Sequence, residues 1–231
     1  HTTESDGRNT LEEMIAAARE RGYAYIAITD HSPRVSMARG LSAERLRAQW
    51  AEIDAVNERL EDFRVLKGVE CDILEAGGMD HPDDVLAEAD WVIASIHYGQ
   101  HQSSEQITDR ILGALANPHV CAVAHPTGRL LGKKRFRKPY EVDLAAVYQA
   151  AREHGKFLEL NATKERLDLN DVQCLAARRA GVPIVLNTDA HSLEGLANMR
   201  YGLLQARRAG LTPADVVNTR PWSEIEKLLG R

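Results

Sequence analysis

Long apolar runs and cysteine pairs are both missing from this sequence. No stretch approaches the roughly 18 apolar residues that a membrane span needs, and no signal peptide is recognisable at the start of the chain. The three cysteines, Cys71, Cys121 and Cys174, are odd in number and form no CxxC pair, which argues against a disulfide framework and against a zinc–thiolate site. These absences favour a protein of the reducing cytoplasm with no membrane partner.

An excess of positive charge is also lacking. The 231 residues include 29 Lys and Arg against 34 Asp and Glu, for a formal net charge of -5. This balance provides no global attraction to nucleic acid or to an anionic membrane, so any site for a polyanion must be local. The length lies in the range where an α/β barrel forms one domain, and we expect a single domain over 1–231.

Short apolar runs alternate with helical patterns along the chain, which is typical of successive βα units around a parallel sheet. Six strands are predicted, at 23–31, 64–74, 90–97, 120–126, 156–162 and 183–191. Helices are predicted at 10–21, 42–61, 103–116, 141–154, 170–180 and 194–209. A seventh strand would end at His1, so we expect that the chain is cut from a longer protein and lacks its first strand. The longest expected loop without regular structure is 126–140.

Ionisable side chains recur at the carboxyl end of nearly every predicted strand. In a parallel α/β barrel these ends face one mouth, where active sites are assembled. Ionised groups crowded together there would repel one another unless cations neutralised them. The sequence therefore predicts a metal cluster, and the candidates at the strand ends are His1, Asp6, Asp30, His31, Glu70, His97, His125, Asp189 and His191.

The types of donor narrow the choice of metal. Imidazole and carboxylate groups without thiolates suit Mn²⁺, Zn²⁺ or Fe²⁺. Glu70 can bridge two metals through its two oxygens, and two metals about 3.5–4 Å apart are the usual arrangement for in-line attack at phosphorus. Water activated in this way hydrolyses a phosphate ester without a side-chain nucleophile.

Six short motifs resemble a known family: HTTESDG, ITDH, GVECDIL, SIHYG, AHPTGR and NTDAHS. In this order and at these intervals they are similar to the polymerase-and-histidinol-phosphatase (PHP) family of metallophosphoesterases, over essentially the whole chain. AHPTGRLLGKK, LELNATKERLDL and the final segment from TDAHS resemble the C-terminal PHP domain of bacterial family X DNA polymerases. The resemblance implies a distorted seven-stranded (β/α) barrel, similar to a TIM barrel, with a trinuclear metal site.

Taken residue by residue, the resemblance implies a set of metal ligands. His1 matches the second histidine of an HxH motif whose first residue is absent here, and Glu70 matches the bridging glutamate. Asp30 is either a ligand or a group that orients an imidazole or a water. The expected catalytic residues are Glu70, Asp189 and His191, and the full expected ligand set is His1, Asp6, His31, Glu70, His97, His125, Asp189 and His191.

Basic residues gather in the predicted loop after His125, together with Phe136 and Tyr140. On the metal-bearing face they favour a local site for a phosphate backbone, and the two aromatic rings could stack on unpaired bases. Arg166 could hold a phosphate through its planar guanidinium. A solvated basic loop is the alternative. The expected substrate contacts are Arg129, Lys133, Lys134, Arg135, Arg166 and His101.

Four other residues are expected to have structural roles. Cys71 adjoins Glu70, so strand alternation points it to the opposite side, into the core. His81, His119 and His154 match no ligand position, and we expect them at the surface or at helix ends.

By resemblance, the leading functional hypothesis is a Mn²⁺-dependent 3′→5′ exonuclease that also removes 3′-phosphates from DNA ends, in support of repair. An upstream polymerase domain would then be its partner in cis, and its cofactors would be two to three divalent metal ions, with Zn²⁺ or Fe²⁺ as alternatives to Mn²⁺. Two other functions stay open: a small-molecule phosphatase similar to histidinol-phosphate phosphatase, and an inactive PHP module that only supports a polymerase. The basic loop argues against the first, and the complete set of visible ligand positions argues against the second.

Overall fold

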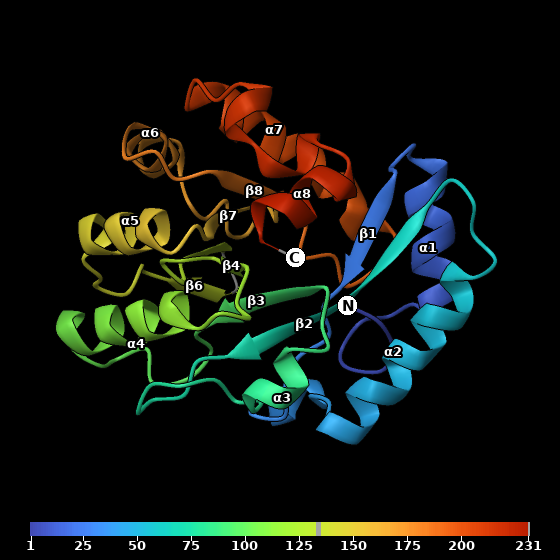
Figure 1. Ribbon diagram of the computed structural model, residues 1–231. Coiled ribbons are helices and arrows are strands. Elements are labelled where there is room, and N and C mark those ends of the chain that lie inside the picture. The colour runs from blue at the N-terminus through green and yellow to red at the C-terminus, as the bar shows by residue number, and fades with distance from the viewer. Residues whose placement is uncertain (133–134, 231) are drawn as a thin grey trace.

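The fold is built on one curled parallel sheet with helices around its outer face (Figure 1). The computed structural model describes residues 1–132 and 135–230. The strand order is β1–β2–β3–β4–β7–β8, and every neighbouring pair is parallel. The strands are β1 Tyr25–Ile28, β2 Arg64–Asp72, β3 Trp91–Ser95, β4 Ala122–Val123, β7 Phe157–Asn161 and β8 Ile184–Asn187. Each coincides with a predicted apolar run, so these six strand predictions are confirmed.

The main helices also lie where the sequence predicts them. Thr10 and Asn170 begin two of them with capping boxes, in which the side chain at the third helical position returns a hydrogen bond to the cap backbone. Two further helices, α3 Asp83–Leu86 and α8 Trp222–Leu228, are not predicted. The six predicted helices are α1 Leu11–Glu20, α2 Ala43–Asn57, α4 Ser104–Ala116, α5 Leu144–Glu153, α6 Asp171–Arg179 and α7 Met199–Arg208.

The sheet forms a half-barrel with apolar packing on both faces. Alternate residues of each strand point outward to the helices or inward. The inward-facing group includes Trp91 and Phe157, whose rings stack with centroids 6.1 Å apart. Trp222 of α8 packs into the same group, with its ring 6.3 Å from that of Tyr25. The C-terminal segment therefore covers the inside of the curled sheet, as its position within the ring of strands in Figure 1 shows.

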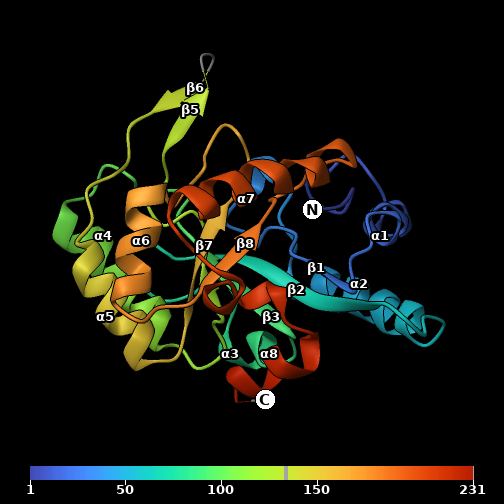
Figure 2. The same ribbon diagram turned by 90° about the horizontal axis from the view of Figure 1, so that it is seen from above.

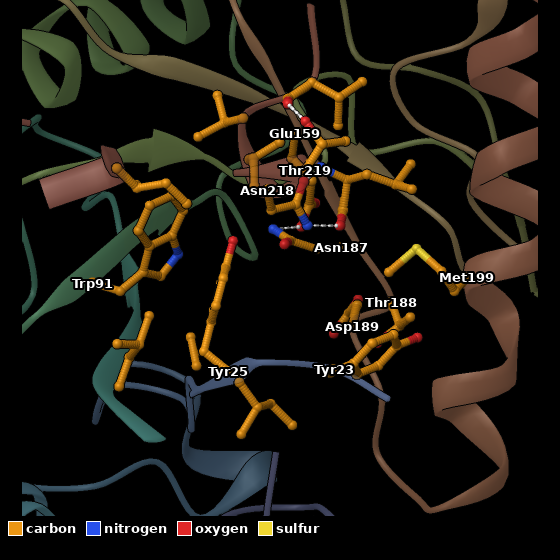
Figure 3. Close-up of a pocket in the computed structure, with 18 of the residues that line it drawn as sticks. Tyr23, Tyr25, Trp91, Glu159, Asn187, Thr188, Asp189, Met199, Asn218 and Thr219 are labelled. Atoms are coloured by element: carbon orange, nitrogen blue, oxygen red, sulfur yellow. Dashed lines mark hydrogen bonds between the residues drawn. The ribbon is translucent and has the colours of Figure 1, made fainter. Parts of the chain in front are cut away.

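A seventh strand is not confirmed: within the described residues the sheet has six strands, with β1 and β8 at its edges. The edge of β8 is partly covered by Asn218, which accepts a hydrogen bond from the Leu186 amide (3.0 Å) and donates one to the Leu186 carbonyl (2.7 Å). Between β1 and β8 lies a cavity of 710 Å³ with a mostly apolar lining. Tyr25, Trp91 and Asn218 border it (Figure 3).

The stretch 126–140, expected to be without regular structure, contains an antiparallel hairpin, so that expectation is wrong in part. Its strands are β5 Leu130–Gly132 and β6 Arg135–Arg137, and Figure 2 shows the hairpin extending away from the barrel. Phe136 is exposed, as expected for a ring that could stack on a base. Tyr140 is buried and packs over Gly128, so its expected stacking role is wrong.

The expected positions of Cys71 and His81, in and near β2, can be compared with the structure. Cys71 is fully buried, as expected for a residue on the opposite side of the strand from Glu70. His81 is only 3% exposed, so it does not lie at the surface, and it directly precedes Pro82, the cap of α3, which is the helix-end position that was the other expectation. Its amide donates a hydrogen bond to the Cys71 sulfur (3.4 Å), and burial lowers the pKa of its ring.

None of the described helices combines the length and the apolar character that a membrane crossing needs.

The C-terminal helix should contribute strongly to stability. Trp222 is 7% exposed against the inner face of the sheet, and removing a buried Trp ring typically costs about 3–5 kcal/mol. We therefore expect Trp222→Ala to lower the free energy of unfolding by about this amount, measured by urea denaturation followed by circular dichroism. Leu228→Ala is the control, because Leu228 lies on the same helix but is 51% exposed. Equal effects of the two substitutions would contradict the packing role of α8.

Candidate metal centre

The expected ligands come together at the carboxyl ends of the strands. Glu70 lies within β2, and the histidines at 97 and 125 each follow the end of their strand by two residues. The loop before α1 adds the side chains of His1 and Asp6. This loop is joined to the segment after β8, because the Arg8 amide donates a hydrogen bond to the His191 carbonyl (2.9 Å). The residues assembled here are His1, Asp6, His31, Glu70, His97, His125, Asp189 and His191.

Glu70 occupies the middle of this cluster and is 4% exposed. Its Oε1 lies 3.0 Å from His125 Nε2 and 3.4 Å from His97 Nε2. Its Oε2 lies 3.3 Å from His1 Nε2 and 3.5 Å from His31 Nδ1. Each carboxylate oxygen thus faces a different pair of imidazoles, which is the arrangement required of a carboxylate shared by two metal ions.

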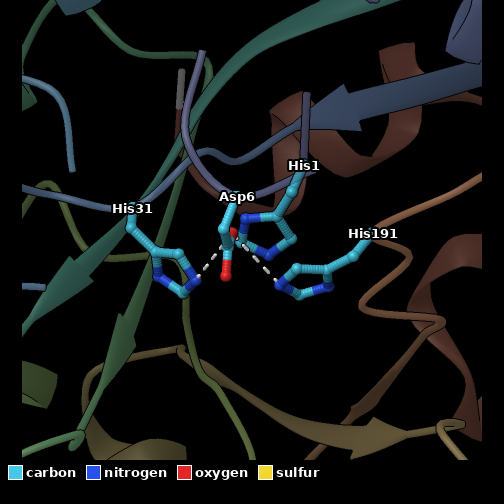
Figure 4. A group of neighbouring side chains, drawn as sticks. All are labelled: His1, Asp6, His31 and His191. Carbon is cyan, nitrogen blue, oxygen red and sulfur yellow. Dashed lines mark ion pairs between the residues drawn. The ribbon is translucent and has the colours of Figure 1, made fainter. Parts of the chain in front are cut away.

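A second carboxylate joins the solvent-facing side of the cluster (Figure 4). Asp6 Oδ1 lies 3.6 Å from His31 Nε2 and 3.4 Å from His191 Nε2. The rings of His1 and His191 stack with centroids 4.0 Å apart. The side chains of Asp6 and His191 are 39% and 36% exposed, so a substrate can reach the cluster from this side.

Three groups of donors are tight enough to hold a metal ion, with ligand atoms within 4.8 Å of one another. Among the described residues, His31 Nδ1 is buried without a hydrogen-bond partner although it faces Glu70, as a nitrogen available to a cation would be. Imidazoles and carboxylates without thiolates fit borderline divalent metals. The groups are His1–Asp6–His31–His191, His31–Glu70–His97 and His1–Glu70–Asp189.

The charges in the cluster shift one another's pKa values. Burial alone would raise the pKa of Asp6, but the hydrogen bond and charge of His191, with the charge of His31, lower it to about 2. Burial lowers the pKa of His31 to about 4, against the attraction of Glu70. Asp189 has a pKa far below its usual range, because its contact with His1 outweighs the effect of burial. Ionised carboxylates and uncharged imidazoles are the forms that bind cations, so His1, whose pKa is raised against the effect of burial by Asp189 and Glu70, would release its proton when a cation binds.

The sequence analysis missed Asp72, which orients one of the ligands. Asp72 is fully buried, and its Oδ1 lies 2.6 Å from His97 Nδ1 and accepts the His97 amide at 3.2 Å. A carboxylate behind a ligating histidine fixes the ring and its tautomer. The signal was present in the sequence, because Asp72 follows Glu70 by two residues and therefore lies on the same side of β2.

Asp30 was expected either to bind metal or to orient an imidazole or a water, and its hydrogen bonds go instead to the N-terminal loop and to α2. It accepts hydrogen bonds from the Thr2 amide (2.8 Å), the Thr2 hydroxyl (2.7 Å), the Gln49 amide group (2.6 Å) and the Ser5 hydroxyl. These contacts hold the loop that carries His1 and Asp6. Asp30 thus holds Thr2 and Ser5, the residues next to the candidate ligands His1 and Asp6.

Two of the candidate ligands have unusual backbone conformations. His125 has φ +28° and Asp189 has φ +50°, in a region that residues other than glycine rarely adopt and that costs roughly 1–3 kcal/mol. Glu159, which the sequence analysis also missed, accepts a hydrogen bond from the His125 amide and is 2% exposed. Burial raises its pKa to about 8, assisted by the charge of Asp189.

The expected substrate contacts differ in their positions. Arg166 lies beside the cluster, with Nε 3.7 Å from Asp189 Oδ2 and a buried Nη1 that has no hydrogen-bond partner among the described residues. Arg129 donates to the backbone carbonyls of residues 166 (2.7 Å) and 167, so it holds the loop that carries Arg166. His101 is exposed on the loop after β3. Lys133, Lys134 and the side chain of Arg135 lie outside the described residues.

Comparison with known proteins agrees with this arrangement. The PHP domain family matches residues 1–163. The DNA polymerase/3′-5′ exonuclease PolX of Bacillus subtilis is 47% identical over all 231 residues, and the chain spans 40% of that protein's length. A protein named as a probable phosphatase from Thermoanaerobacter sp. (strain X514) is 31% identical over 221 residues, which cover 91% of this chain and 84% of that protein.

The fold also resembles solved structures. The crystal structure of histidinol phosphate phosphatase from Lactococcus lactis, in complex with Zn, L-histidinol and phosphate, superposes with a TM-score of 0.59 at 17% identity and covers 92% of each chain. At this identity the likeness concerns the fold alone. The match over residues 1–163 and the 47% identity over the whole chain lead to one conclusion: the chain belongs to the PHP domain family.

Proposed function

We propose that this PHP domain is a metal-dependent phosphoesterase that acts at the 3′ ends of DNA, as a 3′→5′ exonuclease and as a 3′-phosphatase. The observation that carries the proposal is the convergence of five imidazoles and two further carboxylates around Glu70 at the carboxyl ends of the strands. Bound cations would stabilise such a concentration of ionised carboxylates.

The eight candidate ligands would hold two to three divalent ions. Mn²⁺ is the proposed metal, and Zn²⁺ is the first alternative because a phosphatase of the same fold binds Zn. When bound, the ions supply positive charge to the phosphoryl oxygens and lower the pKa of water. The proposed ligands are His1, Asp6, His31, Glu70, His97, His125, Asp189 and His191.

The side chains themselves divide the remaining tasks. Glu70, Asp189 and His191 are the proposed catalytic residues, and the shared position of Glu70 sets the spacing of the sites on either side of it. Arg166 is the proposed phosphate contact, because its unpartnered Nη1 lies beside the cluster and can donate to a phosphoryl oxygen. Asp72 keeps His97 turned toward Glu70.

DNA is the proposed substrate class, with a polymerase domain upstream in cis as the proposed partner. The similarity to the Bacillus PolX protein supports both. The projecting hairpin supports DNA over a compact ester, because an exposed Phe136 and a basic sequence around it suit a strand that extends beyond the cluster. A small-molecule phosphatase is the second candidate, favoured by the similarity to the Thermoanaerobacter protein.

We also propose that the barrel has a seventh strand, formed in a longer chain by residues that precede His1. The His1 amino group donates to the Ala190 carbonyl (2.9 Å) at the end of β8. A strand between β1 and β8 would occupy the apolar cavity that His1 lines. We also propose a cytoplasmic location, as the sequence predicts.

Metal content is the first test of the proposal. After removal of metals with a chelator and reconstitution with Mn²⁺ or Zn²⁺, we expect two to three ions per chain by inductively coupled plasma mass spectrometry. The reason is that each of the three donor groups is close enough to hold one ion. Less than one ion per folded chain after saturation would contradict the proposed centre.

Glu70→Ala tests the shared carboxylate. We expect at least a hundredfold loss of turnover and a lower metal content, because both carboxylate oxygens face imidazoles of different sites. The matched control is Glu75→Ala, which removes a half-exposed carboxylate paired with Arg34 on the segment that follows β2. Circular dichroism checks that both variants fold. Retention of more than a tenth of the activity by Glu70→Ala would refute the role of Glu70.

Neutralising the hairpin separates DNA from small esters. Substitution of Lys133, Lys134, Arg135 and Lys138 by Ser should weaken DNA hydrolysis and make its salt dependence shallower, because fewer counterions are released on binding. Turnover of p-nitrophenyl phosphate should stay within a few-fold of the parent. Arg137 is left unchanged, because its Nε donates to the Gly128 carbonyl (2.7 Å).

The control for the hairpin variant removes equal charge from the outer helices. Arg19, Arg152 and Arg179 are exposed on these helices and Arg59 is exposed just after α2, and substitution of all four by Ser should leave DNA hydrolysis and its salt slope unchanged. An unchanged rate and slope in the hairpin variant would show that the hairpin is only a solvated surface. The small-molecule phosphatase would then become the better proposal.

A further inference from the structure

Glu159 is a carboxylate placed where the fold otherwise puts apolar side chains. It lies in β7 opposite Val185 of β8, and its strand neighbour Phe157 belongs to the apolar inner group. At 2% exposure it is shielded from water. A buried carboxylate is unfavourable unless polar partners satisfy it, so its partners show what it does.

Three hydrogen bonds satisfy Glu159, and each comes from a segment next to the metal centre. Oε2 accepts the His125 amide at 2.6 Å and the Asn161 side-chain amide at 3.2 Å. Oε1 accepts the Asn187 side-chain amide at 3.0 Å. These donors lie at the ends of β4, β7 and β8, so one side chain connects three neighbouring strands at the point where each becomes a loop.

Two of these connections lead to the residues with left-handed backbones. The His125 amide that Glu159 accepts belongs to a residue with φ +28°. Asn161, which donates to Glu159, also donates to Asp189 Oδ2 at 3.0 Å, and Asp189 has φ +50°. Such conformations persist in residues other than glycine only where the surroundings determine them.

The connections also determine which atoms face the cluster. With Asp189 Oδ2 held by Asn161, Oδ1 is the oxygen that lies 3.1 Å from His1 Nε2. With the His125 backbone held by Glu159, its ring places Nε2 3.0 Å from Glu70 Oε1. His125 therefore contacts Glu70 Oε1 directly, whereas Asp189 contacts His1, which lies 3.3 Å from Glu70 Oε2. The hydrogen bonds of Glu159 support both His125 and Asp189.

We propose that Glu159 is a positioning residue of the metal centre, which holds His125 and Asp189 in their ligating geometry before metal binds. The inference rests on the proposed metal centre. It assigns to Glu159 no contact with substrate or metal, because its oxygens are occupied by backbone and amide donors. Partners of this kind typically change metal affinity or activity 10–100-fold when they are removed.

The test measures metal binding without turnover. The metal-free chain is titrated with Co²⁺, and both the affinity and the visible absorption spectrum are recorded, since the spectrum reports the number and geometry of ligands. Glu159→Leu should lower the affinity by about 10–100-fold and change the spectrum. Glu159→Gln should recover most of the loss, because its oxygen can accept the His125 amide while Asn187 turns its own oxygen toward the new donor.

Matched variants separate positioning from a general loss of stability. Glu52 is exposed in α2, so Glu52→Leu and Glu52→Gln repeat the same chemical changes far from the cluster and should bind Co²⁺ as the parent does. Should Glu159→Leu fail to fold, Asn161→Ala carries the test, since it removes the connection from Glu159 to Asp189. It should weaken Co²⁺ binding several-fold with an intact circular dichroism spectrum.

The outcomes distinguish this inference from the proposed centre. A parent chain that binds no Co²⁺ would overturn the metal centre and this inference with it. A parent that binds Co²⁺, with a folded Glu159→Leu or Asn161→Ala variant of equal affinity and identical spectrum, would overturn the positioning role alone. Loss of affinity in Glu159→Leu with recovery in Glu159→Gln would support it.

Discussion

The mouth of this half-barrel depends on one buried carboxylate. Glu70 is 4% exposed, and nitrogens of four imidazoles lie within 3.5 Å of its carboxylate oxygens. Burial opposes its ionisation, yet the surrounding histidines hold its pKa well below the usual range. An ionised carboxylate in this position requires positive charge close by. The neighbouring donors are therefore arranged so that divalent cations can provide that charge and join the separate strand ends into one site.

The parallel sheet explains how distant segments reach Glu70. Successive parallel strands end at the same edge, so side chains just past each strand meet there whatever their separation in sequence. Closing the barrel is a separate problem, because β1 and β8 are not hydrogen-bonded neighbours. Trp222 and its helix α8 cover the inner face, and Asn218 completes the hydrogen bonding of Leu186 at the edge of β8. Stability at the base and chemistry at the mouth are thus provided by different parts of the chain.

Behind the candidate ligands lies a second group of buried carboxylates. Asp30 holds the loop of His1 and Asp6, Asp72 orients the ring of His97, and Glu159 holds the backbone of His125. Each accepts several hydrogen bonds and none is exposed by more than 2%. Ligand geometry that is supported in this way does not have to be created by the metal itself. The histidines and carboxylates of the cluster can then remain in place when cations are absent.

Local patterns in the sequence were sufficient for six strands and six helices, because periodicity depends on neighbouring residues alone. They also gave the eight residues of the cluster, but together with Asp30, which the structure gives other partners. They were also sufficient for the buried place of Cys71. Only the tertiary structure decided the burial of His81 and Tyr140, the hairpin within 126–140 and the covering of the inner face by α8. The roles of Asp30 and Glu159 were decided there too, since their partners Gln49, His125 and Asn187 are 19 to 34 residues away in sequence. A carboxylate within a strand or just after it has the same local pattern whether it binds a metal or supports a ligand, and only the three-dimensional positions of its hydrogen-bond donors distinguish the two.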